Sequence, residues 1–382
     1  MTKKYKLTHH TKEVDGHTLH RIKALKSFGD VKKGDLGGWV EGYHNLSQSD
    51  TAWVYDKAKV YDDARVFDNA KVRDHARVYG DAWVYKNAWV YGHARVSDVA
   101  GVSGNAWVHG HAKVYDNAKV WGQAQIRGNA WVYNHTKVLD NAKVYGEACI
   151  YDQARVLDNA QVGGNAWVYN NAYVVGNAKV LDKAQIYGNA CVYDNAIVRG
   201  HAEIYDHVSV YGYAWVYDDA KVWGCASISG HAHVYGDARI YGNAKVHGNA
   251  IVCGYAHVCG NVHVYDNAKV YGDSILQGRI NIREDDDIKD NYSYLIFNNT
   301  WSSGRQFVYV LSNQRWHVGC FNGTGDELIK KAYRDSKLSG KMYGLYVNFA
   351  EQAVKTQQQL QSHKEWKHWY DPYPSLRDWL GL

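Results

Sequence analysis

The chain has 382 residues, with 44 Lys and Arg against 39 Asp and Glu and a net charge of +5 at pH 7. This length exceeds one ordinary globular domain, and so weak a positive charge does not by itself indicate an anionic partner. Six cysteines without a CxxC pair favour a reduced compartment. The first ten residues lack an apolar signal core and no run reaches transmembrane length, so we expect a soluble, cytoplasmic protein without a membrane partner.

Residues 1–51 are expected to form an N-terminal cap. Two alternating runs, KKYKLT and HTLHRIKAL, flank Asp15 and Gly16, a pair typical of a β-hairpin turn. Such a cap would cover the end of the sheet that follows, because an uncovered end invites pairing with another chain.

Residues 52–273 consist of 37 consecutive six-residue units without an insertion or deletion. The first position is Ala in 34 units and the third is Val or Ile in all of them, which predicts a short strand with its apolar side facing inward. The fifth position is mostly Gly or Asp, residues that tolerate the backbone of a tight corner. Three units would complete one turn of a three-sided solenoid, giving about 12 turns from these 37 units.

The repeat resembles the hexapeptide-repeat, left-handed β-helix superfamily. It keeps the aliphatic residue (Val54, Val60) and the small residue four positions later (Ala58, Ala64), but it often has Tyr directly after the aliphatic residue. Residues 35–48, DLGGWVEGYHNLSQ, resemble the YdcK-like members, which include phage-encoded relatives. The resemblance implies a left-handed parallel β-helix, and phage origin with action in the bacterial host cytoplasm would fit.

The repeat decays after Asp273, and the acidic run at residues 284–287 suggests a boundary. We therefore assign the β-helix to residues 52–285 and a small C-terminal α/β domain to residues 290–382. Thr324 and Glu327 form a capping-box signature that predicts a helix over 325–337, followed by a second over 341–366. We expect the tail tryptophans to pack on this domain: Trp366, Trp369 and Trp379.

The superfamily resemblance implies acyl transfer as a possible enzyme activity. In such enzymes a His acts as general base, and coenzyme A binds between the subunits of a trimer. Many corners carry His, for example His75, His93, His111, His201, His207 and His231. None has an evident loop or carboxylate beside it, and we interpret these residues as substitutes for Asn. We thus predict no catalytic residue and no cofactor, and keep an acyltransferase-like enzyme as the alternative.

One local group of potential metal ligands stands out in the repeats: His233, His257, His263, Cys253 and Cys259. Their spacing matches no zinc motif, so we interpret them as exposed repeat positions and predict no metal site.

The outward positions differ between the three walls. Wall 1, made of the unit at residue 58 and every third unit after it, has an aromatic residue at ten of 12 fourth positions, including Tyr115, Tyr133, Tyr151, Tyr169, Tyr187 and Tyr205. Its second positions begin with Lys59, Arg77, Arg95 and Lys113. This pattern predicts a surface for nucleic acid, a nucleotide or a glycan. The alternative is that stacked rings and surface charge only stabilise and solubilise the wall.

Wall 2, made of the unit at residue 64 and every third unit after it, carries aliphatic and aromatic side chains between about residues 137 and 211. They are Leu139, Leu157, Val175, Tyr173, Tyr193 and Tyr211. Exposed apolar side chains in a row mark an interface. We predict that another subunit or a partner covers this patch in a homo-oligomer, a dimer or trimer.

Taken together, these patterns favour a non-enzymatic scaffold or binding protein. Its long walls and C-terminal domain would hold a protein partner or a ligand, from the host if the chain is phage-encoded.

Overall fold

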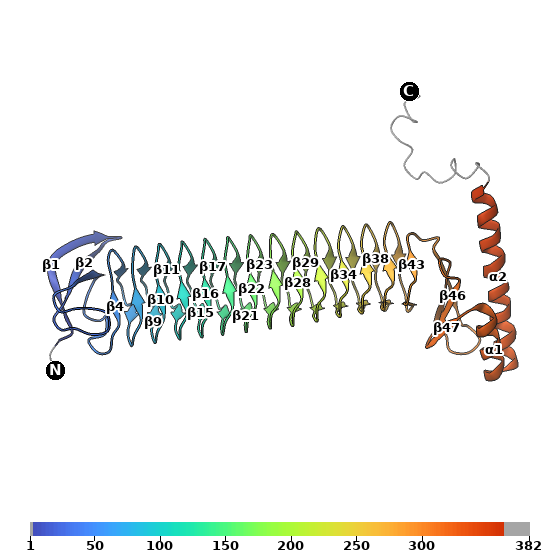
Figure 1. The fold of residues 1–382 in the computed structure, drawn as a ribbon, viewed down its shortest axis with the longest axis horizontal. Helices are drawn as coiled ribbons and strands as arrows, with labels where there is room; N and C mark the ends of the chain where they lie inside the picture. The colour runs from blue at the N-terminus through green and yellow to red at the C-terminus, as the bar shows by residue number, and fades with distance from the viewer. Residues whose placement is uncertain (1–2, 363–382) are drawn as a thin grey trace, which may run out of the picture.

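The computed structural model describes residues 3–362, which form a long three-sided parallel β-solenoid between an N-terminal hairpin and a C-terminal unit of sheet and helices (Figure 1). The solenoid strands have two residues each and recur every six residues, from β4 (Trp53–Val54) to β43 (Asp287–Ile288). Each pairs in parallel with the strand three further along the chain, so the strands build three walls.

The walls expected from the sequence are the sheets observed. Wall 1 runs from β5 (Lys59–Val60) to β41 (Ile275–Leu276), wall 2 from β6 (Arg65–Val66) to β42 (Asn281–Ile282), and wall 3 from β4 to β43. Wall 3 contains 14 strands, so the solenoid has about 14 turns rather than 12. The coils continue past Asp273 because Leu276, Ile282 and Ile288 keep the inward apolar position, and each is fully buried.

The interior is a column of Ala and Val with no exposed surface. The corners turn through a left-handed backbone at the fifth position of each unit, where φ is 51° at Asp56 and 64° at Gly80. An Asp there also links successive coils, since Asp62 Oδ2 accepts from the Gly80 N–H at 3.0 Å. Asp, Asn and Gly recur at the corners because they allow this backbone at little cost.

The N-terminal cap contains the predicted hairpin. β1 (Tyr5–Val14) and β2 (His17–Ala24) are antiparallel, and the turn between them has positive φ at Asp15 and Gly16. β3 (Leu36–Val40) pairs with β2 on one side and in parallel with β5 on the other. Gly38 permits this contact, since a Cβ there would lie 2.7 Å from the Ala58 carbonyl oxygen.

The C-terminal unit is a four-stranded antiparallel sheet with two helices. Its elements are β44 (Tyr294–Asn298), β45 (Gln306–Val310), β46 (Arg315–Val318), β47 (Phe321–Gly323), α1 (Gly325–Asp335) and α2 (Lys337–Ser362). The predicted capping box at Thr324 and Glu327 is present. Phe307, Trp316 and Leu328 form the centre of a separate core. The three tail tryptophans lie outside the described residues, and none of the helices within 3–362 is long and apolar enough to span a membrane.

One corner residue departs from the repeat in a way that predicts a stability change. Lys86 has φ 57° at a fifth position, where almost every other unit has Gly, Asp or Asn. Lys86→Gly should raise the free energy of unfolding by about 1 kcal/mol, because glycine adopts this backbone without a Cβ clash. Lys183→Gly, at a sixth position, is the control in urea denaturation and should destabilise the chain. Equal effects of the two changes would contradict this account.

A second prediction concerns Thr136, which replaces Ala on the inner face and is fully buried. Its Oγ1 has no hydrogen-bond partner. Thr136→Val keeps the shape and removes the unsatisfied hydroxyl, so the free energy of unfolding should rise by about 1 kcal/mol. Val208→Thr, at an equivalent position, should lower it by a similar amount; the same urea titration measures both variants.

Candidate ligand-binding wall

Wall 1 carries a ladder of stacked aromatic rings along its fourth positions. Ring centroids lie 4.8 Å apart for Tyr115 and Tyr133, and 4.9 Å apart for Tyr169 and Tyr187. The same stacking links Tyr151 and Tyr205 into one run that continues to Trp223 and Tyr241. All six tyrosines predicted as ligand-binding residues therefore lie in one column.

The stacking determines which parts of the aromatic rings are accessible to a ligand. Each ring covers the faces of its neighbours, so the ladder presents ring edges and hydroxyl groups rather than open faces. Burial raises the pKa of Tyr115 to about 12, and it also raises the pKa values of Tyr133, Tyr151, Tyr169, Tyr187 and Tyr205. The phenols consequently stay protonated and add no negative charge to the wall.

The ladder has one missing rung near its N-terminal end. Ser97 stands where the repeat places an aromatic ring, between the Tyr61–Tyr79 stack and the Tyr115 column. Its hydroxyl donates to Asp98 Oδ2 at 2.9 Å, and a hollow of about 280 Å³ opens there between Tyr79, Tyr115 and Trp131. We call this hollow the Ser97 gap; it is the place on the column where two tyrosines lack a neighbouring ring.

The predicted basic strip lies directly beside the gap. Lys59, Arg77, Arg95 and Lys113 are consecutive register partners on wall 1. Arg77 pairs with Asp15 of the cap at 3.1 Å, and Lys59 is only 9% exposed. Burial, with the charges of Arg77 and Lys12, lowers the pKa of Lys59. Arg95 and Lys113 are thus the two cations most available to a ligand.

Three histidines extend this strip around the corner. His75, His93 and His111 stack on one another with centroids 4.8 Å apart. They and the four cations line a hollow of about 370 Å³ with no carboxylate among its lining residues. We call these seven residues the cationic corner. It shares Arg95 and Lys113 with the Ser97 gap.

From the sequence alone, we interpret the three corner histidines as substitutes for Asn, without a link to the basic strip. The signal was available, because they are spaced 18 residues apart, one full turn, and each stands two residues before a cation of wall 1. The grouping becomes evident only when the corner is folded.

The residues of the predicted interface share wall 2, and all are half-buried within the chain itself. Tyr193 and Tyr211 stack at 4.9 Å, and Arg155 lies over the Tyr173 ring at 5.1 Å. The arrangement is a continuous half-apolar column, and its role as an interface remains a prediction.

The His and Cys group near the end of the repeats is dispersed by the fold. Its three histidines lie on three different walls, His257 on wall 1, His263 on wall 2 and His233 on wall 3. Side chains on separate faces of the prism cannot surround one metal ion.

A different cluster joins the cap to the first coil. His17 Nδ1 lies 3.1 Å from Glu41 and His17 Nε2 lies 2.9 Å from Asp62. Because each ring nitrogen already faces a carboxylate, the geometry is that of an imidazolium bridge rather than an open metal site. The hydrogen bond that the His17 ring donates to Glu41 raises the pKa of His17. Burial alone would raise the pKa of Glu41. The carboxylate accepts hydrogen bonds from His17 and from the Asp62 N–H, and these outweigh burial, so the pKa of Glu41 is lowered.

Three segments of the repeat region match the family model of the YdcK β-solenoid repeat: residues 76–92, 184–200 and 238–254. The chain carries YdcK-type β-solenoid repeats. Each matched segment begins at the Ala that opens a wall 1 unit and covers almost one turn. Residues 35–48, which suggested the resemblance, lie outside the three matched segments. No curated protein matches the chain.

Several solved structures match this chain at low similarity. The Arabidopsis UDP-N-acetylglucosamine acyltransferase is 12% identical, covering 72% of this chain and 99% of its own, with a TM-score of 0.33. The Francisella novicida enzyme of that name is 12% identical over 51% of this chain and 66% of its own, with a TM-score of 0.23. The Moraxella catarrhalis UDP-N-acetylglucosamine O-acyltransferase is 10% identical over 76% of this chain and 93% of its own, with a TM-score of 0.18. At these values the likenesses carry no information about activity.

The bridge at His17 predicts a pH-dependent contribution to stability. A raised pKa means that the protonated ring is stabilised in the folded state. The loss of stability in His17→Gln should therefore be largest below the ordinary His pKa of 6.5, while Glu41 is still ionised, and should shrink as pH rises through the raised pKa.

The measurement is urea denaturation of both proteins between about pH 5 and pH 9. His9→Gln, an exposed change on β1, serves as the control. A pH-independent difference between wild type and His17→Gln would show that the ring contributes by packing alone.

Proposed function

We propose that the chain is a non-enzymatic binding protein that holds a segment of single-stranded nucleic acid on wall 1. The backbone phosphates would lie in the cationic corner and a base would enter the Ser97 gap. The observation that carries this proposal is that the two hollows adjoin and share Arg95 and Lys113.

The charge arrangement supports an anionic chain. The four cations follow one another at the strand spacing of about 4.8 Å, and like charges in directly opposed positions destabilise a sheet. Further along wall 1, where Lys221 and Arg239 are register partners, a carboxylate offsets this cost, because Lys221 Nζ also lies 2.8 Å from Glu203. Within residues 3–362, the one carboxylate that forms an ion pair with a member of the cationic corner is Asp15, on Arg77. A row of phosphates would supply the missing negative charge.

The aromatic side supports a nucleotide over a simple polyanion. Tyr79 and Tyr115 each lack a neighbouring ring toward Ser97, and Trp131 is 40% exposed beside them. Lys113 Nζ lies 4.0 Å from the Trp131 ring centroid, so one cation borders both hollows. A planar base fits such a position because it gains stacking without needing a specific hydrogen-bond pattern.

Acyl transfer gains no support from this geometry. Every corner between residues 53 and 288 is a short turn within the six-residue period, and no loop extends from the prism to form an active-site wall. We include in the proposal that copies of the chain associate through the half-apolar column of wall 2, which leaves wall 1 accessible.

The first test changes the two shared cations. Arg95→Gln with Lys113→Gln should weaken binding of a fluorescent single-stranded oligonucleotide roughly tenfold or more, since charge-assisted hydrogen bonds are lost. The slope of log affinity against log salt should fall by about 1.4, or 0.7 for each lost phosphate contact. Fluorescence anisotropy across a salt series measures both quantities.

A matched pair on wall 3, Arg127→Gln with Lys143→Gln, removes the same charge and should leave affinity and slope nearly unchanged. If both pairs weaken binding equally, the effect comes from net charge and the wall 1 site is wrong.

The second test fills the gap. Ser97→Tyr restores the repeat and should fold, yet it should weaken oligonucleotide binding without altering any charge. Affinity for inorganic polyphosphate, which has no base, should stay the same in this variant. Equal affinity of Ser97→Tyr and wild type for the oligonucleotide would exclude base insertion.

A further inference from the structure

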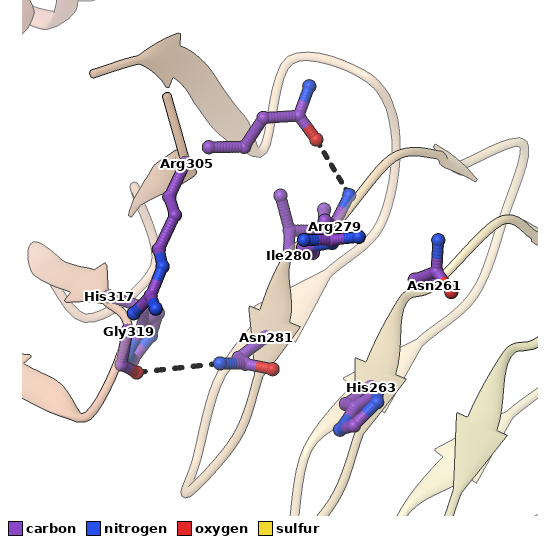
Figure 2. Close-up of a pocket in the computed structure, with 9 residues that line it drawn as sticks. Asn261, His263, Arg279, Ile280, Asn281, Arg305, His317 and Gly319 are labelled. Carbon is purple, nitrogen blue, oxygen red and sulfur yellow. Dashed lines mark hydrogen bonds between the residues drawn. The ribbon is translucent and has the colours of Figure 1, made fainter. Parts of the chain in front are cut away.

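Another hollow, of about 470 Å³, lies where the last coils of wall 2 meet the C-terminal sheet (Figure 2). Asn261, His263, Arg279 and Asn281 reach it from the solenoid, while Arg305 and His317 come from the C-terminal unit. This junction pocket has no carboxylate among its lining residues.

One side of the junction pocket is held rigidly by a buried network. His317 is 2% exposed and its Nε2 lies 2.8 Å from Asp286, which is fully buried. Its Nδ1 accepts from Arg283 Nε at 3.2 Å. Arg283 also donates to the Tyr265 hydroxyl and to the Phe321 carbonyl. The solenoid and the C-terminal sheet are thereby joined directly beneath the pocket.

The four arginines near this junction fall into two classes. Arg283 and Arg315 already have partners: Arg283 donates to His317 in the buried network, and the Arg315 guanidinium lies 3.6 Å from the Glu284 carboxylate. Arg279 and Arg305 are exposed, and neither forms an ion pair with a carboxylate of residues 3–362. The Arg305 guanidinium instead lies beside Gly319, where a Cβ would be 3.7 Å away. Two guanidinium groups therefore face a hollow without a counter-charge.

Amide donors complete the lining. Asn243 Nδ2 donates to Asn261 Oδ1 at 3.4 Å, continuing a corner ladder of the kind seen at Asn141 and Asn159. The next rung of this ladder is Arg279, so no further Asn receives the Asn261 amide. Asn281 also lines the pocket, and its Nδ2 donates to the Gly319 carbonyl oxygen at 3.5 Å (Figure 2).

We propose that the junction pocket binds a small phosphate monoester. Two planar guanidinium forks match the oxygens of a phosphate, and neutral amide donors suit the remaining oxygens. The volume exceeds that of a phosphate group and lies within the range of small-molecule sites, so it accommodates a sugar-sized body as well. This inference is independent of the nucleic-acid proposal, because the two sites share no residue.

The experiment is isothermal titration calorimetry of the full chain with ribose 5-phosphate, inorganic phosphate and ribose at constant ionic strength. We expect one saturable site per chain for both phosphates and no heat from ribose. Arg279→Gln with Arg305→Gln should weaken binding of ribose 5-phosphate roughly tenfold or more.

Two control pairs make the result specific. Arg127→Gln with Arg199→Gln removes two arginines from wall 3 and should leave the affinity unchanged. Arg95→Gln with Lys113→Gln should also leave it unchanged, while weakening oligonucleotide binding roughly tenfold or more, so failure of one proposal is distinguishable from failure of the other. Arg305→Lys, which keeps the charge but loses the planar fork, should give an intermediate affinity.

Unchanged affinity in the Arg279 and Arg305 double variant would overturn the proposal, as would phosphate binding that is lost only when Arg95 and Lys113 are changed. Thermal unfolding without ligand guards against misfolding. If the double variant unfolds earlier than wild type, the affinity of the Arg305→Lys variant decides the matter, and a wild-type affinity there would overturn bidentate recognition.

Discussion

The structure depends on one backbone constraint, the hydrogen bond from each coil to the carbonyl 17 residues ahead. Trp53 donates to Ala70 at 3.0 Å, Tyr55 to Val72 at 2.7 Å and Lys59 to Ala76 at 2.9 Å, and the same step recurs along the solenoid. One residue inserted within a strand would move the side chains that follow it to the other face, so the strands tolerate no single-residue insertion. Proline, which cannot donate, is accordingly absent from residues 52–288.

This constraint places every side chain directly above the one 18 residues earlier. Surface chemistry consequently appears as columns: tyrosines in one, cations in the next, histidines along the adjoining corner. A column of like residues is costly when the residues are charged and favourable when they are aromatic. Stacking in the tyrosine column favours stability, whereas the row of cations in the cationic corner opposes it, and this difference is why we propose a ligand at the N-terminal end of wall 1.

Each end of the solenoid would be an open sheet edge, and the two ends are covered by different interactions. At the N-terminus, β3 adds to wall 1, and the buried amine of Lys4 donates to the Ser49 and Ala52 carbonyl oxygens at 3.0 and 2.8 Å. At the C-terminus, the Asp286–His317–Arg283 network attaches a second folded unit to the last coils. Both ends satisfy backbone groups that an open sheet edge would leave unpaired.

Much of this architecture is readable from the residues alone, because Ala and Val at fixed positions and Gly, Asp or Asn at corners leave few other folds for a strict six-residue period. The hairpin at Asp15 and Gly16 and the helix cap at Thr324 follow from equally local rules. The sequence also determined which residues share each wall, since residues 18 apart in an unbroken six-residue repeat lie at the same position of the same wall. The sequence assignment to residues 52–285 already included Leu276 and Ile282, and the tertiary structure added the strand at Ile288, because a weakened repeat still buries one apolar side chain per unit.

Tertiary structure alone decided where the hollows lie. The corner histidines join the wall 1 cations across a bend, and Arg279 meets Arg305 across a junction between units distant in sequence. Such pairings depend on how one element packs against another. A local pattern of residues cannot encode that relation, because packing is set by the shape and burial of both partners at once.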